Sequence, residues 1–188
     1  DVDKHIWELA CRQLKKWKDN GRENVYISVN LSSRDFYFLN IYQIFTERVK
    51  KYKIEPENLR LEITETAVMM NFERQLSLIN RLREYGFIVE MDDFGSGYSS
   101  LNMLKDIHVD VLKLDMAFLQ KNQDTDRGKQ ILQTIITLSK QLGIPVISEG
   151  VETIEQVNFL AEMGCDIFQG YYFASPMSVE KFENTYLN

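Results

Sequence analysis

Short runs of β-branched and apolar residues alternate with longer amphipathic runs along the sequence, and this alternation restricts the chain to a few folds. Each strand-like run is followed by a run with helical periodicity. No hairpin signal joins two strand-like runs directly, so the pattern predicts an α/β fold in which helices cover a mainly parallel sheet. The predicted strands are residues 25–32, 59–65, 87–94, 109–115, 145–151 and 166–173.

Helices are predicted at the start of the chain and after each strand. The leading helix places apolar residues on one face, which we expect to be buried: Ile6, Leu9, Ala10, Leu14 and Trp17. Several later helices end at a glycine, which suits a helix C-cap: Gly86, Gly143 and Gly164. The predicted helices are residues 1–18, 41–52, 72–86, 99–105, 128–143 and 153–164, with a last one after Pro176.

Polar side chains fall at or near the carboxyl end of every predicted strand. They are Asn30, Glu62, Asp92, Asp93, Lys113, Asp115, Glu149 and Gln169. In a TIM-like (β/α)8 barrel these strand ends converge on one face, where active sites are built. In a doubly wound open sheet they would spread along a crevice around one switch point. Polar residues at all six strand ends favour the barrel.

The predicted barrel is incomplete, because such a barrel has eight strands and the sequence supplies six. The chain also opens almost inside its leading helix. We therefore expect residues 1–188 to be a partial domain that lacks its first one or two strands. An unclosed barrel exposes two strand edges, which favours pairing with another chain.

The adjacent acids Asp92 and Asp93 stand where a strand gives way to the glycine-rich run FGSGYSS. Two like charges repel each other unless a cation or a donor lies between them. Each polar strand end taken alone could be a helix cap. However, alternation places Lys113 and Asp115 on one side of their strand, and a buried lysine requires a carboxylate partner.

Oxygen ligands without a cysteine or histidine cluster favour Mg²⁺ or Mn²⁺ over zinc. Two such ions about 3.5–4 Å apart can assist an in-line phosphoryl displacement. The strand ends therefore predict a two-metal site. Shorter motif matches are rejected: Asp93-Phe94-Gly95 matches a kinase triplet without the other kinase elements, and Gly95-x-Gly97 lacks the third glycine of a dinucleotide loop, at Ser100.

Composition excludes some partners. The net charge of −6 argues against a DNA- or RNA-coating protein, which needs a basic face. No apolar run approaches the roughly 18–20 residues that span a bilayer, so no membrane contact is expected of this segment. Cys11 and Cys165 lack metal-type spacing and are predicted to be reduced thiols of a cytoplasmic domain.

Six segments together resemble the EAL domain, a family of bacterial cyclic di-GMP phosphodiesterases. They are VNLSS, LEITE, DDFGSGYSSL, LKLD, SEGVET and QGYYFASP, in this order and at these spacings. The resemblance covers essentially the whole chain. It implies a (β/α)8-type barrel that hydrolyses cyclic di-GMP to linear pGpG with Mg²⁺ or Mn²⁺. It further implies a homodimer, and a parent chain with sensory or GGDEF-type domains that could carry a membrane anchor elsewhere.

The resemblance also implies roles for individual residues. Lys113 resembles the lysine assigned as general base or water-orienting group, and both roles stay open. Glu65 resembles the glutamate that holds the loop 94–100, which the family links to dimerisation and regulation. Metal ligands are implied at Asn30, Glu62, Asp92, Asp93, Asp115 and Glu149, and further catalytic or substrate-positioning groups at Glu152 and Gln169.

The sequence departs from the family in lacking the Glu-Ala-Leu motif and the segment that carries it. Because every later motif is intact, we attribute the absence to truncation and expect the 188-residue piece to be inactive or weakly active. Three alternatives remain: a non-catalytic cyclic di-GMP receptor that acts through dimerisation, a structural fragment that associates through open edges, and a sugar-isomerising barrel.

Overall fold

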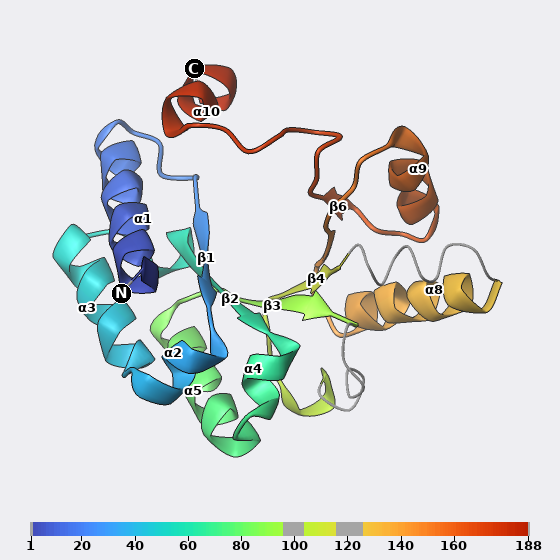
Figure 1. Cartoon of the computed structure of the whole chain (residues 1–188), viewed down its shortest axis with the longest axis horizontal. Helices are drawn as coiled ribbons and strands as arrows, with labels where there is room; N and C mark the ends of the chain where they lie inside the picture. The colour runs from blue at the N-terminus through green and yellow to red at the C-terminus, as the bar shows by residue number, and fades with distance from the viewer. Residues whose placement is uncertain (1, 96–103, 116–125, 188) are drawn as a thin grey trace.

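The structure is a computed structural model that describes residues 2–95, 104–115 and 126–187. Its centre is one parallel sheet whose strands neighbour each other in chain order, β1 to β6 (Figure 1). A doubly wound sheet would reverse direction at a switch point, and this order does not. The barrel-type fold is therefore confirmed. The strands are β1 (Ile27–Leu31), β2 (Leu59–Thr64), β3 (Val89–Phe94), β4 (Val111–Leu114), β5 (Val146–Ser148) and β6 (Ile167–Phe168).

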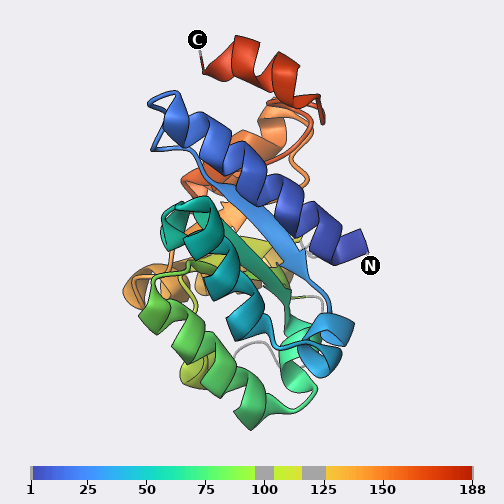
Figure 2. The ribbon, with the colours of Figure 1, turned by 90° about the vertical axis from the view of Figure 1, so that its left-hand side faces the viewer.

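Helices cover the outer side of the sheet. α1 packs on β1 and on α3, which in turn contacts α5 (Figure 2). The predicted helix at 99–105 lies mostly outside the described residues. The helices are α1 (Val2–Asp19), α2 (Ser33–Phe38), α3 (Ile41–Tyr52), a 3-10 turn (Pro56–Asn58), α4 (Glu65–Met69), α5 (Phe72–Tyr85), α8 (Asp126–Gln141), α9 (Ile154–Glu162) and α10 (Val179–Tyr186).

Alternation along the strands separates two faces of the sheet. Odd-numbered side chains of β2 are fully buried against the helices, whereas even-numbered ones point to the other side, which we call the inner face. Aromatic rings fill the helix side: the ring of Phe45 lies 4.9 Å from Trp7 and 6.1 Å from Phe87. The apolar side fixes the register of the strands, and the inner face is left for polar groups.

The buried face of α1 differs from the prediction. Ile6 and Leu9 are about half exposed, whereas Trp7 and Cys11 are buried. The buried stripe is rotated because the Trp7 indole reaches the core and donates a hydrogen bond to the backbone oxygen of Asn30 at 3.1 Å. The two cysteines are free and buried.

The last strand is also shorter than predicted, with two residues instead of eight. Gly170 explains its end, because a Cβ atom at that position would lie 2.1 Å from the backbone oxygen of Val151. The chain can pass Val151 this closely only with a glycine, and it then turns away from the sheet. Tyr172 donates a backbone hydrogen bond to the Val151 oxygen at 3.0 Å, which fixes the turn.

The barrel is incomplete, as predicted. Within the described residues, β1 pairs only with β2 and β6 pairs only with β5. The chain after β6 crosses back toward α1, where α10 packs (Figure 1). Glu183 of α10 accepts hydrogen bonds from Trp17 Nε1 at 2.8 Å and Lys16 Nζ at 3.0 Å. The rings of Trp17 and Phe182 lie 5.8 Å apart. Side chains thus connect the two ends of the open sheet.

Candidate active site

Caps begin the helices that follow the first two strands, and they shape the rim of the site. Ser32 caps α2 through a reciprocal pair of hydrogen bonds with Asp35. Thr64 caps α4, and its hydroxyl accepts from the Ala67 amide at 3.3 Å. The polar residues Asn30 and Glu62 are not needed as caps, so they remain free for other contacts.

Four charged side chains from the carboxyl ends of four different strands converge on one point of the inner face, with Glu149 directly after β5. The Lys113 ammonium lies 2.7 Å from Glu62 Oε1, 2.8 Å from Glu149 Oε1 and 3.5 Å from Asp92 Oδ1. Its side chain is only 4% exposed. We call Glu62, Asp92, Glu149 and Lys113 the carboxylate cluster. The predicted convergence of the strand-end acids and of Lys113 is present in these four.

Burial and mutual repulsion set the protonation of the carboxylate cluster. Burial raises the pKa of Glu149 to about 7, against the lowering effect of Lys113, and the Asp92 charge adds to the rise. Burial also raises the pKa of Glu62, with contributions from the charges of Asp92 and Glu90. Although burial opposes it, hydrogen bonds to Glu149 and Glu62 raise the pKa of Lys113. The cluster therefore carries a net negative charge and favours cations.

Asp93 takes a position that strand alternation did not predict. Its φ of 54° is left-handed, and the register between β3 and β4 shifts between Met91 and Phe94. Such a β-bulge re-aims a side chain at the end of a strand. Burial, followed by the charges of Asp92 and Asp115, raises the pKa of Asp93. The bulge therefore keeps both adjacent acids within electrostatic range of the cluster.

The other predicted site residues surround this centre at varying depth. Asn30 is exposed and lies beside Glu62 in the ladder, and Asp115 directly follows β4. Glu152 and Gln169 line a groove of about 890 Å³ with Glu149. Glu65 is buried at the start of α4, but most of the loop that it was predicted to hold, residues 96–100, lies outside the described residues.

The donor atoms of the cluster suit a hard divalent cation, since all three anionic ligands are carboxylates. In the described part of the chain, no three acidic, histidine or cysteine side chains form a ready metal site. The Lys113 ammonium itself occupies the point that the three carboxylates share. A divalent ion bound here would compete with this ammonium or lie beside it, with Asn30, Asp93 and Asp115 as the nearest further oxygen-bearing side chains along the strand ends.

Two charged residues of the inner face were not predicted from the sequence. Arg60 and Glu90 lie two residues before Glu62 and Asp92, and they form an ion pair of 3.0 Å. The same period-two alternation that placed Lys113 and Asp115 together could have shown them, because both have the parity of the site residues.

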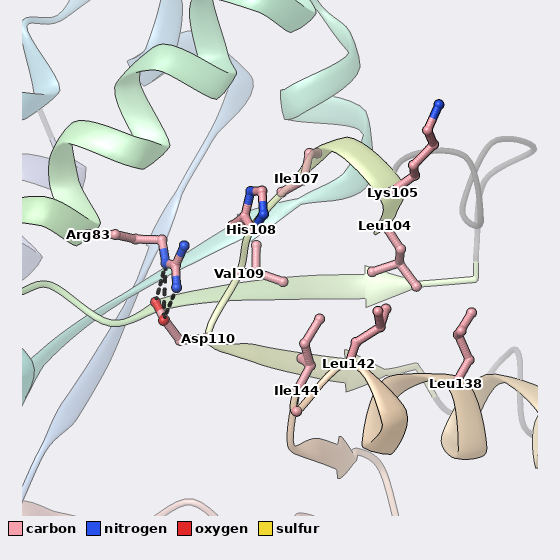
Figure 3. Close-up of a pocket in the computed structure, with 11 residues that line it drawn as sticks. Arg83, Leu104, Lys105, Ile107, His108, Val109, Asp110, Leu138, Leu142 and Ile144 are labelled. Carbon is pink, nitrogen blue, oxygen red and sulfur yellow. Dashed lines mark hydrogen bonds and ion pairs between the residues drawn. The ribbon is translucent and has the colours of Figure 1, made fainter.

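A separate hollow of about 670 Å³ opens at the opposite, amino-terminal ends of the strands (Figure 3). Aliphatic side chains such as Leu138 and Leu142 form its walls. Arg83 and Asp110 form a bidentate ion pair at its side, with a shortest distance of 2.8 Å. The hollow holds no group of carboxylates and lies at the end of the strands opposite the polar residues. We therefore place the candidate active site at the carboxyl ends.

Comparison with known proteins identifies the family to which this fold belongs. The sequence profile of the EAL domain matches residues 1–176. The chain belongs to the EAL domain family. Among curated relatives of this EAL chain, the signaling protein YkoW of Bacillus subtilis is 36% identical over 183 residues, which are 97% of this chain and 23% of that protein. The cyclic di-GMP phosphodiesterase PdeR of Escherichia coli is 33% identical, covering 94% of this chain and 27% of that protein. The EAL chain thus spans about a quarter of these relatives.

Solved structures of EAL proteins share the fold. The PaMucR phosphodiesterase in complex with c-di-GMP superposes with a TM-score of 0.89 at 32% identity, covering 96% of this chain and 73% of that one. The EAL domain of Mycobacterium smegmatis DcpA gives a TM-score of 0.89 at 27% identity, covering 98% and 83%. None of the helices in the described ranges of the EAL chain is both long and apolar enough to cross a bilayer.

Proposed function

We propose that this chain is the larger part of an EAL domain that hydrolyses cyclic di-GMP to linear pGpG with Mg²⁺ or Mn²⁺. One observation carries the proposal: Glu62, Asp92 and Glu149 come from three strands and meet within 3.5 Å of one ammonium nitrogen. A mere set of helix caps would not converge in this way. The names of the relatives, which include cyclic di-GMP phosphodiesterases, support the choice of substrate.

The position of each site residue indicates its proposed role. Glu62, Asp92 and Glu149 would hold divalent cations, with Asn30, Asp93 and Asp115 completing the ligand shells. Such ions lower the pKa of bound water and neutralise the charge on a phosphodiester. Glu152 and Gln169 line the groove next to Glu149 and would position the substrate.

Lys113 would act as a cation and not as a base. It donates hydrogen bonds to Glu62 and, at a comparable distance, lies against Glu149, so the cluster holds its protonated form. From this place the ammonium can orient a water molecule and stabilise negative charge on the phosphate in the transition state. Of the two roles that the family resemblance left open, the contacts favour this one.

We also propose that residues 1–188 lack the first one or two strands of their domain. Among the described residues, β1 and β6 each have one edge without a neighbouring strand, which supports this proposal. The groove of about 890 Å³ supports it too, because residues from both ends of the sheet line it, including Tyr26 and Gln169. A strand beside β1 would complete the ladder and add ligands to the site. The isolated piece is then inactive or weakly active.

Assignments beyond the site follow from the family. We place the domain in the cytoplasm, as a homodimer within a longer chain that carries sensory or GGDEF-type domains. The multidomain length of its relatives, of which it spans about a quarter, supports this arrangement.

The test compares turnover of cyclic di-GMP by residues 1–188 with turnover by a chain extended upstream by about 60–70 residues, the length of two βα units. Both are supplied with Mn²⁺, and product is identified as pGpG. We expect turnover only, or far faster, in the extended chain, and its loss in Glu149→Gln. Equal turnover by both chains would refute the truncation, and binding without hydrolysis by the extended chain would instead establish a receptor.

A further inference from the structure

A second pair of charged side chains lies next to the carboxylate cluster, two residues before Glu62 and Asp92 on their strands, with Glu90 beside Glu62 in the ladder. Arg60 Nη1 lies 3.0 Å from Glu90 Oε1, and Ser28 Oγ donates to Glu90 Oε2 at 2.9 Å. The Glu90 side chain is 2% exposed and that of Arg60 is 23% exposed. Three adjacent strands, β1 to β3, are thus connected by one buried carboxylate. We call Arg60 and Glu90 the lower pair.

The position of the lower pair requires an explanation. The inner position that pairs with Glu90 on β4 is apolar, Val111, and the inner position of β5 is apolar too, Ile147. Branched apolar side chains normally fill this layer of a barrel. Replacing a buried ion pair with apolar residues is often neutral or stabilising, because burial removes water from both charges. Stability alone therefore does not account for a charged pair here.

The guanidinium of Arg60 is fixed on two sides. Its carbon atom lies 3.5 Å from the centre of the Tyr26 ring, and one of its terminal nitrogens contacts Glu90. Its Nε is buried without a hydrogen-bond partner among the described atoms. Arg60 and Glu62 have the same parity on β2, so the guanidinium lies one step below a carboxylate of the cluster.

We propose that Arg60 and Glu90 are positioning residues that set the charge and alignment of the carboxylate cluster. Glu90 holds the guanidinium below the cluster, so Glu62 and Asp92 stay available to Lys113 and to divalent cations. The pair also aligns the ends of β2 and β3, which carry these two carboxylates. The part that concerns cations rests on the proposed function of the cluster as a metal site.

The two members of the pair have opposite effects on a bound cation. In Glu90→Gln the amide keeps the size of the side chain and an acceptor for Ser28, but the guanidinium loses its anion and its charge acts on Glu62 and Asp92. In Arg60→Met the carboxylate of Glu90 is left beneath the cluster and adds negative charge. We expect Mn²⁺ affinity to fall about five-fold in Glu90→Gln and to rise about five-fold in Arg60→Met, as for one charge acting across several ångströms of protein.

Stability separates this role from a structural one. Both single variants leave a buried charge without its partner, so both are expected to unfold at lower urea concentration. If the pair had only a structural role, both variants would lose stability and both would also bind Mn²⁺ more weakly. Arg60→Lys, which keeps the charge, and the double variant Arg60→Met with Glu90→Leu, which removes both charges, should bind Mn²⁺ within about two-fold of the unchanged chain.

The experiment titrates each 188-residue chain with Mn²⁺ at one pH and ionic strength, with free Mn²⁺ measured by electron paramagnetic resonance. Arg83→Met is the matched control, because Arg83 forms a bidentate ion pair with Asp110 at the opposite ends of the strands. It should lower stability and leave Mn²⁺ affinity unchanged. Affinity shifts of the same sign in Glu90→Gln and Arg60→Met, or no shift in either, overturn the proposal.

A second measurement keeps the two proposals apart. If the unchanged chain and all variants fail to bind Mn²⁺, residues 1–188 do not form the metal site by themselves, and the alignment of the strands is tested without metal. Amide hydrogen exchange should then be faster in β2 and β3 of Glu90→Gln relative to β5. Unchanged relative exchange would contradict the positioning role itself.

Discussion

The half of the sheet formed by β1 to β3 differs from the half formed by β4 to β6. The first three strands contain five, six and six residues, whereas the last three contain four, three and two. On the inner face, the residues that precede the site are the charged Arg60 and Glu90 in the first half and the apolar Val111 and Ile147 in the second half. Each half nevertheless supplies two members of the carboxylate cluster.

The site is therefore held by strands of unequal length. Glu62 and Asp92 stand on long ladders, while Lys113 and Glu149 stand at the ends of short ones. The contacts of Lys113 with Glu62 and Glu149 therefore connect the two halves as well as balancing charge. The following predictions test this view, beginning with the contact that joins the halves.

Lys113→Met should have the largest effect. It leaves three buried carboxylates without their cation, and we expect a loss of about 3–5 kcal/mol in the free energy of unfolding. Urea unfolding measures it, and added Mn²⁺ should restore part of the loss. Lys140→Met is the control, because its ion pair with Asp166 is exposed and should contribute less than about 1 kcal/mol. Equal effects of the two substitutions would contradict a special role of Lys113.

The second-largest effect should be a difference in the free energy of unfolding between core substitutions in the two halves. Leu61→Ala in β2 removes a side chain that is 0% exposed, and we expect a loss of about 2–4 kcal/mol. Ile167→Ala in β6 removes a side chain that is 45% exposed, and we expect less than about 1 kcal/mol. Urea midpoints compare the two variants. A greater loss at Ile167 would show that the β6 end is packed more tightly than its exposure indicates.

The pH dependence of stability should report on Glu149. Its pKa of about 7 in the folded chain exceeds the ordinary value of 4.5, so the folded state binds the proton more tightly. The stabilisation from this group is then full below pH 4.5 and is lost as the pH rises through about 7. We expect a loss of about 1–2 kcal/mol, because solvent screening reduces the effect of a partly exposed carboxylate. Unfolding in urea across this range measures the slope.

Glu149→Gln should flatten this slope, because the amide does not titrate. Mn²⁺ should oppose the decrease as well, since a bound cation favours the ionised carboxylate. A slope that persists unchanged in Glu149→Gln would assign the pH dependence to other groups.

The two thiols should give the smallest effect, a difference in rate with no change in global stability. Cys11 is buried on α1, and burial raises its pKa to about 12, so its thiolate is scarce. Cys165 is also buried, but it contacts Ser148 and the backbone beside the short strands β5 and β6. We expect alkylation of Cys165 several-fold sooner than of Cys11 by local opening. Mass spectrometry of chymotryptic peptides distinguishes the two alkylated cysteines. Faster alkylation of Cys11 would contradict the view that the half formed by β4 to β6 opens more readily.

Much of the fold followed from the sequence because period-two and helical patterns are local properties. The strand order and the convergence of Glu62, Asp92, Lys113 and Glu149 came from alternation and from the geometry of parallel strands. The bulge at Asp93 could not be predicted from the sequence, because no local pattern here indicates a positive φ at an aspartate. The rotated face of α1 and the early end of β6 depend on contacts with Asn30 and Val151, which lie far away in the sequence.

Within the site, the lower pair was missed for a similar reason. Alternation alone could place Arg60 and Glu90 on the inner face, but nothing in the sequence pairs two residues 30 positions apart until the strands are placed side by side. The adjacent acids suggested a shared cation, and the structure adds that the Lys113 ammonium lies 3.5 Å from Asp92 Oδ1. Charge balance was predictable, but the group that provides it depends on three-dimensional distance.

The packing of α10 on α1 has a practical consequence. The chain contains two tryptophans, and both belong to α1. Trp7 is enclosed by the core, whereas the Trp17 indole donates to Glu183 across the opening of the sheet. In a Trp7→Phe variant, the fluorescence of the remaining indole would report whether the two ends of the molecule are joined or apart, without any attached dye.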